Sequence, residues 1–408
     1  MFRSHGGNSQ PNAAPAADAG HATTPSGIAD NSAADSGAGI ASRRHWAIDF
    51  TGSGSEYFRI WIVNLFLTIV TLGLYYPWAR VRRLRYFYTN TLVALQPLDF
   101  HAEPKKMLRG YLLAVLLLGA YSMAGEFSNA AGLVAFIFVM AIWPLLMNAS
   151  LQFRMANTSW SGLRFHFSGS PQEAYAAALP LFLPGLAFLA LLMWMRDSEQ
   201  VPAWLISALG TLTVITLLSF PWLYWRLKNF QHRKYGLASQ QTRFKASAGS
   251  FYWVFVKALG LLLLAGAGAG LIVMAALELS GSPHARATGA AAAPFATILV
   301  FLVAVAPYLT SRMQNLVWSK TGNGSLRFIS HLSFRSLLGL TLKNWLLMLV
   351  TLGLYWPFAA VAVARLRLES VRIISLLTPD ELLAQSRASQ VDALGDAAGD
   401  VFGIEMGL

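Results

Sequence analysis

Residues 64–79 read NLFLTIVTLGLYYPWA, and residues 344–359 read NWLLMLVTLGLYWPFA. The two stretches align without gaps at an offset of 280 positions and share ten of sixteen residues, which marks an internal repeat. Each copy carries a glycine and then a proline inside an apolar run. Because glycine is flexible and proline cannot donate a backbone hydrogen bond, we expect helix breaks at Gly73 and Pro77, and again at Gly353 and Pro357.

Softer repeats extend this organisation along the chain. WAIDFTGSGSEYF (46–58) parallels LRFHFSGSPQEAY (163–175), and similar strand-like pieces occur at 98–102, 242–246 and 326–330. Each piece precedes an apolar helix. A proline also recurs late in the helix that leads into each loop, at Pro77, Pro144, Pro221, Pro307 and Pro357. The pattern predicts a unit of strand, helix, outer turn, helix and basic linker, repeated about five times with abbreviated first and last copies.

The composition excludes a soluble globular enzyme. Of the 408 residues, 55% are apolar and only 12% are charged, whereas soluble domains carry about 25% charged residues. A helix needs about 20 apolar residues to cross the hydrocarbon of a bilayer. Six charge-free runs approach or exceed that length, at 110–125, 127–153, 174–195, 200–225, 258–277 and 287–311. The sequence therefore predicts a multi-pass membrane protein.

Basic residues gather in the loops 80–109, 226–257 and 312–343, which the positive-inside rule places in the cytoplasm. Three helical hairpins follow, with 57–79 and 337–359 as two further broken or re-entrant helices, so that both termini are expected in the cytoplasm. Short strands at the cytoplasmic helix ends would pair with one another, since an isolated strand leaves its backbone unsatisfied. The predicted fold is an all-α polytopic membrane bundle with internal repeats and a small cytoplasmic β cap.

Three regions are expected. Residues 4–41 have almost no large apolar side chains, so 1–45 are expected to be a disordered tail. Residues 46–375 are expected to form the membrane domain, and 376–408 a polar C-terminal tail. The net charge of +12 fits membrane lipids with anionic headgroups as partners, and no nucleic-acid-binding motif accompanies it, so no nucleic-acid partner is expected. The absence of cysteine excludes disulfides and thiolate chemistry.

Asn64 and Asn344 occupy equivalent places in the strongest repeat. A buried amide without a partner costs several kcal/mol in an apolar medium, so each predicts either a hydrogen bond between helices or a polar constriction on a substrate path. The same alternatives apply to Thr68, Thr71 and Thr351, whose hydroxyls can bind carbonyls freed at the helix breaks.

A cluster of arginines follows the first copy of the repeat. Guanidinium groups pair phosphate in a bidentate manner, so these side chains are candidates for contact with an anionic lipid or solute, although topology alone also explains them. The cluster comprises Arg80, Arg82, Arg83 and Arg85.

No motif in the sequence names a reaction or a cofactor. Three imidazoles can hold zinc, and His101, His166 and His331 all lie in strand-like pieces. Their offsets within the copies differ, however, and no second-shell partner accompanies them. We therefore expect no metal, no cofactor and no enzymatic activity.

The stretch TLGLYYPWA (71–79), followed by ARVRRLRYFY, and its second copy TLGLYWPFA (351–359) resemble the YjgN-like family of bacterial inner-membrane proteins, a domain family of unknown function. Gly52, Glu56 and Asn64 stand in the family's order, and the resemblance covers about 46–375. The second copy departs from the first, because Arg80, Arg82 and Arg83 correspond to Ala360, Ala362 and Val363. The resemblance implies a bacterial inner-membrane location and no assigned reaction.

The expected function is a passive transporter or channel for a small solute or lipid. Transporters built from internal repeats place their sites at discontinuous helices, and carboxylates are nearly missing from the apolar runs, which disfavours a proton-driven pump. The alternative is a non-catalytic envelope scaffold or regulatory membrane partner, with a protein partner that the sequence does not identify. A transporter requires a polar cavity between the repeats, whereas a scaffold requires a filled core and an exposed cap.

Overall fold

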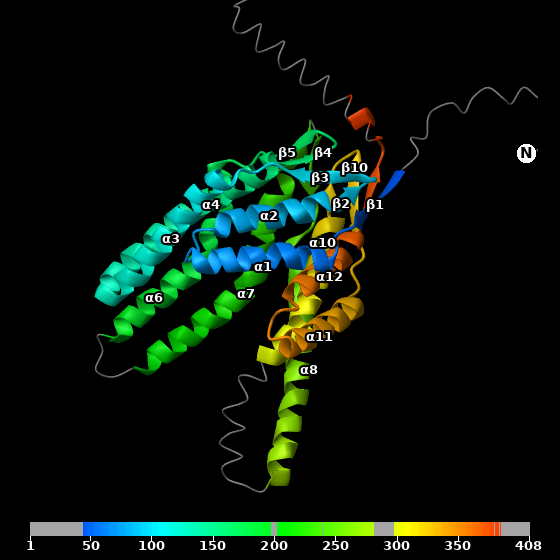
Figure 1. Cartoon of the computed structure of the whole chain (residues 1–408). Helices are drawn as coiled ribbons and strands as arrows, with labels where there is room; N and C mark the ends of the chain where they lie inside the picture. Colours follow the sequence, from blue (N-terminus) through cyan, green and yellow to red (C-terminus); the bar gives the residue numbers. More distant parts are fainter. Residues whose placement is uncertain are drawn as a thin grey trace, which may run out of the picture. The chain divides into compact units, whose positions relative to one another are not determined.

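Helical hairpins and β-hairpins alternate along the chain in the computed structural model, which describes residues 44–196, 202–238, 240–280, 298–378, 380–382 and 384 (Figure 1). Nearly all of the predicted tail 1–45, and most of 376–408, lie outside the described residues. The strands are β1 (Arg44–Phe50), β2 (Thr91–Val93), β3 (Gln96–Phe100), β4 (Thr158–Trp160), β5 (Leu163–Phe167), β6 (Tyr235–Leu237), β7 (Gln240–Gln241), β8 (Arg243–Phe244), β9 (Thr321–Gly322), β10 (Leu326–Ser330) and β11 (Val371–Ser375).

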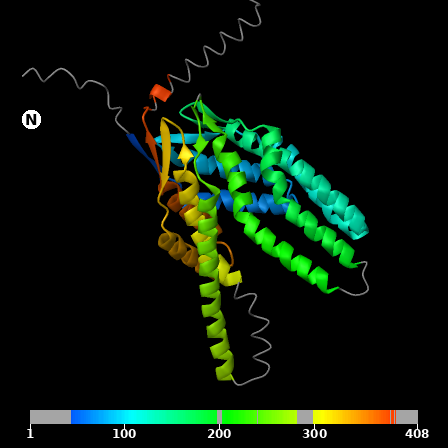
Figure 2. The ribbon, with the colours of Figure 1, turned by 180° about the vertical axis from the view of Figure 1, so that it is seen from behind.

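The helices are α1 (Gly54–Val70), α2 (Tyr76–Thr89), α3 (Pro104–Phe127), α4 (Asn129–Ala156), α5 (Pro171–Ala178), α6 (Leu183–Arg196), α7 (Ala203–Arg233), α8 (Ala248–Ser280), α10 (Ala306–Ser319), α11 (Phe334–Val350) and α12 (Trp356–Glu369). A 3-10 segment, η1 (Leu179–Leu181), joins α5 to α6, and a π-helical segment, η2 (Phe301–Val305), precedes α10. In both views the helices leave the sheet from one rim (Figures 1 and 2).

The strands form one antiparallel sheet in the order β7-β6-β5-β4-β3-β2-β1-β11-β10-β9-β8. β7 and β8 stand at the two ends of this order, although only Thr242 separates them in the chain. Gln240 and Gln241 pair with β6, while Arg243 and Phe244 pair with β9. The two ends of the sheet are therefore halves of one extended segment, and the sheet closes on itself as a ring.

Five β-hairpins make up the ring, and one of them is split between the two ends of the chain. Turns connect the hairpins β2–β3, β4–β5, β6–β7 and β9–β10, and Ser161 and Gly162 in one such turn have φ of 50° and 82°, the left-handed values that tight β-hairpins require. In the fifth hairpin β1 pairs with β11, with Trp46 opposite Ile373. We call this pair of strands the seam of the ring. The first and last copies of the repeat thus complete one another.

One backbone hydrogen bond recurs at every junction between units. The residue after each outgoing strand donates its N–H to the carbonyl of the residue that ends an incoming helix, at 2.8–3.0 Å: Thr51 to Asn90, His101 to Asn157, Ser168 to Lys234, Lys245 to Lys320, and His331 to Ser370. A buried proline lies thirteen residues before each of these carbonyls, at Pro77, Pro144, Pro221, Pro307 and Pro357. The five units are therefore structurally equivalent.

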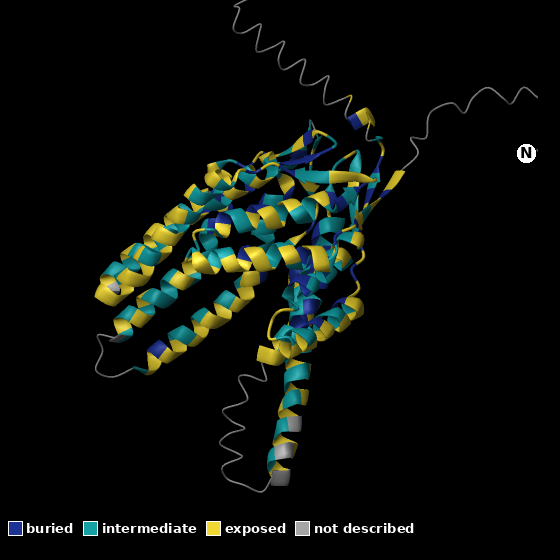
Figure 3. Ribbon diagram, in the orientation of Figure 1, coloured by how far each residue is buried: buried dark blue, intermediate teal, exposed yellow. Residues whose placement is uncertain are grey.

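The interior of the ring is filled by apolar side chains. Trp160 is only 2% exposed, its Nε1 donates to the carbonyl of Val93 at 3.0 Å, and its ring lies 5.6 Å from that of Trp46. Buried residues from five strands and from the C-terminal segment make up the cluster: Trp46, Val93, Trp160, Leu163, Ile373 and Leu382. Figure 3 shows the buried residues gathered at the sheet and at the adjoining helix ends.

The prediction of an all-α bundle with a small β cap is wrong. An eleven-stranded, nearly closed antiparallel sheet organises the molecule. Among the described residues, four helices are long and apolar enough to cross a membrane, or five if α5 and α6, bent by 44°, form one span. In the apolar windows of these four helices only 0–6% of the residues are buried. Lipid provides no hydrophobic drive for helices to associate, and the sheet supplies a link between all five units.

Trp160→Ala should lower the free energy of unfolding by about 3–5 kcal/mol, because it empties the centre of the ring core. Trp160→Phe should cost less, about 1 kcal/mol for the lost hydrogen bond plus a packing change. Denaturant unfolding of the full chain in detergent, followed by circular dichroism, measures both. Phe127→Ala, at an exposed position on α3, is the control, and a Trp160→Ala protein as stable as this control would contradict a packed ring core.

Candidate functional site

Two of the five helical hairpins, α1–α2 and α11–α12, are much shorter than the others. α1 and α11 have 17 residues each, about 25 Å of helix, whereas α7 has 31 residues, about 46 Å. These two hairpins are neighbours in the ring, since α1 packs on α12 beside the β1–β11 seam. One sector of the molecule thus reaches a shorter distance from the sheet than the rest.

The tips of the short hairpins are built alike. Gly73 and Gly353 have φ of 91° and 90°, and Leu72 and Leu352 before them are also left-handed. The Gly73 N–H donates to the carbonyl of Thr68 and the Gly353 N–H to that of Met348, both at 2.7 Å. The chain reverses here, so that α1 ends at Val70 and α2 begins at Tyr76, with Pro77 in its first turn, as Pro357 is in that of α12.

Threonine hydroxyls satisfy the backbone at these tips. Thr71 Oγ1 donates to the carbonyl of Leu67 at 2.7 Å and accepts from the Tyr75 N–H at 2.9 Å, and Thr351 makes the same two contacts with Leu347 and Tyr355 at 2.6 and 3.0 Å. Thr68 Oγ1 donates to the carbonyl of Asn64 at 2.6 Å. A turn that satisfies its own polar groups is suited to an apolar medium.

The outer surface of each tip is apolar and uncovered. Leu72 is 95% exposed and Leu352 is 93% exposed, and the residues just before each turn, Ile69, Val70, Leu349 and Val350, are also exposed. An exposed apolar patch on this scale marks a surface that contacts another apolar phase. In a membrane protein, that phase is the hydrocarbon of the bilayer.

Asn64 and Asn344 are buried on α1 and α11, and in each residue the side-chain Oδ1 has no hydrogen-bond partner. No hydrogen bond joins the two residues. Asn148 on α4 shows the same feature. A hydrogen bond between helices, one of the two alternatives that the sequence offers, is therefore not present at either Oδ1.

Basic side chains lie over aromatic rings at the sheet-side ends of the helices. Arg226 stacks on Trp222 at 5.2 Å, Lys257 on Trp253 at 4.6 Å and Arg312 on Tyr308 at 5.7 Å. Aromatic and basic residues occupy the headgroup level of membrane proteins, and basic residues mark the cytoplasmic side. The pairs therefore indicate where the interface crosses the helices.

The four candidate arginines of α2 have different surroundings. Arg83 lies 5.3 Å from the ring of Trp356 and joins α2 to α12, and Arg85 Nε donates to the carbonyl of Phe100 at 3.4 Å. Arg82 is exposed. Arg80 lines a cavity of about 50 Å³ between α2, α3 and α4, with Arg154 and Ser150 opposite it.

The sequence analysis did not predict that Arg154 and Ser150 line the same cavity as Arg80. The available signal was that Arg154 is the first charged residue after the apolar run 127–153. Burial raises the pKa of Tyr235 on β6, and the nearby positive charge of Arg154 acts in the opposite direction. Arg154 therefore lies close to β6, in the last turn of α4 on the side of the sheet.

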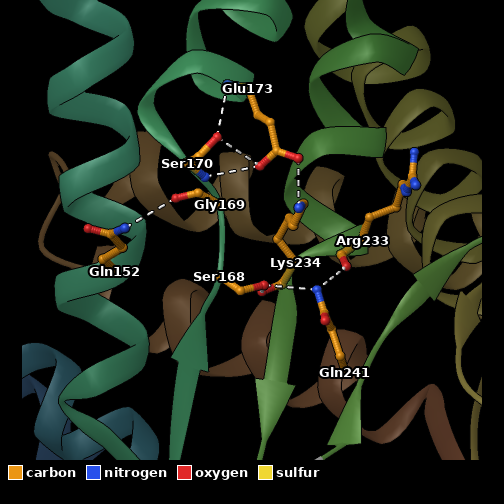
Figure 4. A network of polar contacts seen from close by, with 8 residues as sticks. All are labelled: Gln152, Ser168, Gly169, Ser170, Glu173, Arg233, Lys234 and Gln241. Carbon is orange, nitrogen blue, oxygen red and sulfur yellow. Dashed lines mark hydrogen bonds and ion pairs between the residues drawn. The ribbon is translucent and has the colours of Figure 1, made fainter.

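A second polar cluster is structural. Glu173 accepts from the Ser170 N–H at 3.0 Å at the start of α5 and pairs with Lys234 Nζ at 2.7 Å (Figure 4). Gln241 Nε2 bridges Ser168 and the carbonyl of Arg233 beside it. These contacts tie β5, β7 and α7 together at one junction of the ring.

The three histidines of the strand-like pieces lie at different strands: His101 follows β3, His166 is on β5, and His331 follows β10. His101 shares a 2.7 Å hydrogen bond with Ser159, and the backbone of His331 bonds Ser370. His166 lies on β5 opposite Gly236. Among the described residues, no group of three or more histidine, cysteine or acidic side chains is placed to hold a metal ion.

Gly73→Ala and Gly353→Ala should each destabilise the protein by about 1–2 kcal/mol, because a Cβ is unfavourable in the left-handed region. Gly339→Ala, inside α11 with open space around it, is the matched control and should be neutral or stabilising by up to about 1 kcal/mol. Unfolding midpoints in detergent measure the difference. Equal effects at the three positions would show that the turn geometry does not matter to stability.

Asn64→Leu and Asn344→Leu should leave the stability unchanged or raise it by up to about 2 kcal/mol, because each replaces a buried oxygen that lacks a partner. The same unfolding measurement applies, with the double variant compared with each single one. A loss of about 1 kcal/mol or more in both single variants would mean that the amides bind a group in the membrane.

Comparisons with known proteins agree with the membrane character of the chain. Residues 45–401 match a family described as a bacterial protein of unknown function, DUF898. The inner membrane protein YjgN of Salmonella typhimurium is 26% identical over 332 residues, which cover 76% of this chain and 84% of that protein. A protein of the same name from Escherichia coli O157:H7 is 31% identical over 138 residues, 33% of this chain and 34% of that protein.

No solved structure matches the chain significantly. The match of residues 45–401 covers most of the sequence, and it confirms the resemblance inferred from the TLG-x-Y-x-P repeat. The chain is similar to the inner membrane proteins named YjgN, and it belongs to the DUF898 family of bacterial proteins of unknown function.

Proposed function

We propose that this protein is a non-catalytic scaffold of the bacterial inner membrane, in which the β ring forms a rigid platform on the cytoplasmic side and the helical hairpins anchor it in the bilayer. The observation that carries the proposal is the filled ring. Trp46 and Trp160 meet at its centre, and Leu382 joins them from the C-terminal segment, so the ring leaves no room for a solute. This is the packed core that distinguishes a scaffold from a channel.

The arrangement of the helices supports the same proposal. A transporter of solutes needs helices that enclose a polar path, whereas at most 6% of the residues in the apolar windows of α3, α4, α7 and α8 are buried. Exposed apolar residues along these helices are suited to contact with lipid. The hairpins therefore act as membrane anchors.

The proposed orientation follows from charge. The pairs of basic and aromatic residues lie at the sheet-side helix ends, so the ring and the chain ends that leave it belong on the cytoplasmic side. Three hairpins cross the bilayer in this arrangement. α1–α2 and α11–α12 re-enter on the cytoplasmic side, because about 25 Å of helix, part of it above the interface, does not cross about 30 Å of hydrocarbon.

A second candidate function is the passive movement of lipid beside the short hairpins, and the observation that favours it is their limited reach. Helices shorter than the hydrocarbon thickness thin the bilayer around them. Thinner hydrocarbon lowers the barrier to headgroup passage. This candidate keeps the expected transport activity but places its path at the surface of the protein.

Single cysteines test the orientation, because the chain has none of its own. Leu95, 79% exposed in the β2–β3 turn, and Leu72, at a hairpin tip, are both leucines in left-handed turns and form a matched pair. Leu95→Cys should react with a membrane-impermeant maleimide only in inside-out vesicles, and Leu72→Cys in neither orientation. Labelling of Leu72→Cys from the outside would mean that α1 spans the membrane.

Purified full-length protein in liposomes should release an entrapped small solute no faster than empty liposomes do. A fluorescent-lipid reduction assay on the same liposomes separates the two candidates, since a scaffold leaves half of the label protected and a lipid-moving protein exposes all of it. Solute efflux above the background would refute the scaffold.

A further inference from the structure

The structure holds a cavity that the scaffold does not require. It lies between α2, α3 and α4 at the ring end of the helices, with a volume of about 50 Å³, room for a few water molecules or one small anion. Leu84, Phe100, Met107 and Phe153 form its apolar wall. It opens to the surface, and its polar lining consists of the exposed residues Arg80, Ser150 and Arg154, two guanidinium groups and one hydroxyl.

The charges around this cavity are not balanced by the protein. In the described part of the chain, the ion pairs are Lys106–Glu103, Lys234–Glu173 and Arg365–Glu369, so neither Arg80 nor Arg154 has a carboxylate partner. Neither guanidinium group takes part in a hydrogen bond or a cation–aromatic contact among these residues.

A third basic side chain adds to the positive charge near this cavity. Lys228 on α7 lies within range of the Arg154 charge, and its Nζ donates only to Gln231 Oε1, at 3.1 Å, while resting over the ring of Tyr224. Like charges held together by a fold repel one another, and a bound anion removes that repulsion. The three basic residues come from three different hairpins.

The donor set identifies the class of ligand. Two arginine forks present parallel N–H groups that match the oxygens of a phosphate, and Ser150 adds a hydroxyl donor. The volume admits a phosphate group. The apolar wall and the position at the cytoplasmic ends of membrane helices suit a phosphate attached to a lipid, and basic pockets of this kind between helices bind lipid headgroups.

We propose that Arg80, Arg154 and Ser150 form a phosphate-binding site between α2, α3 and α4. The phosphate has two possible sources, an anionic phospholipid headgroup or free phosphate. The site is distinct from the scaffold function, because neither the ring core nor the hairpin anchors depend on its occupancy.

The test uses the full chain in an uncharged detergent, with three ligands titrated separately: inorganic phosphate, short-chain phosphatidylglycerol, and a short-chain diacylglycerol without phosphate. Thermal unfolding and thermophoresis report binding. Arg80→Gln and Arg154→Gln should each weaken the binding of phosphatidylglycerol at least tenfold, since each removes a charged donor. Arg82→Gln, which makes the same charge change on α2 outside the cavity, is the matched control and should bind as the unmodified protein does.

The outcomes are separable. Binding of phosphatidylglycerol alone assigns the site to a lipid headgroup, binding of inorganic phosphate as well assigns it to the phosphate itself, and both support the proposal. Where a glutamine variant fails to fold, Arg80→Lys and Arg154→Lys keep the charge but lose the fork, and they should bind several-fold more weakly. Equal binding of the diacylglycerol, or equal weakening by Arg82→Gln, would overturn the proposal.

Discussion

Antiparallel pairing between β1 and β11, from opposite ends of the chain, is the constraint on which the architecture depends. An open sheet exposes unpaired backbone groups at its edges, and only closure removes them. In the other four β-hairpins a turn joins the two strands. β1 and β11 have no such turn, so their hydrogen-bonded pairing alone makes this hairpin. This pairing and the five junction hydrogen bonds fix where each helical hairpin emerges from the sheet.

The sequence predicted the parts of this fold that carry strong local patterns. Charge-free runs predicted the long helices, and the five late prolines all lie thirteen residues before a junction carbonyl. The outgoing strands at 46–50, 98–102, 163–167, 242–246 and 326–330 were also recognisable. Their partners were not, because strands of two or three residues such as β2 and β9 are too short to show an alternating pattern.

The ring itself could not be predicted, because its closure depends on contacts between residues far apart in sequence. Trp46 and Trp160 meet at the centre although 113 residues lie between them, and nothing local to either tryptophan predicts the other. The same holds for the phosphate site. Arg80 stands out in a basic cluster, but only the folded chain brings Arg154 and Ser150 to it, while Arg83 and Arg85 from that cluster are engaged with Trp356 and Phe100.

The seam between β1 and β11 also sets the order in which the molecule can be assembled during translation. β1 emerges first, and about 320 residues separate it from β11, which takes on the order of tens of seconds at 5–20 residues per second. During that time β1 can pair with β2 on one side only, and its other edge stays open. The ring is therefore completed only after β11 has been synthesised, and a chain that stops before Val371 leaves β1 with an edge that can pair with another protein.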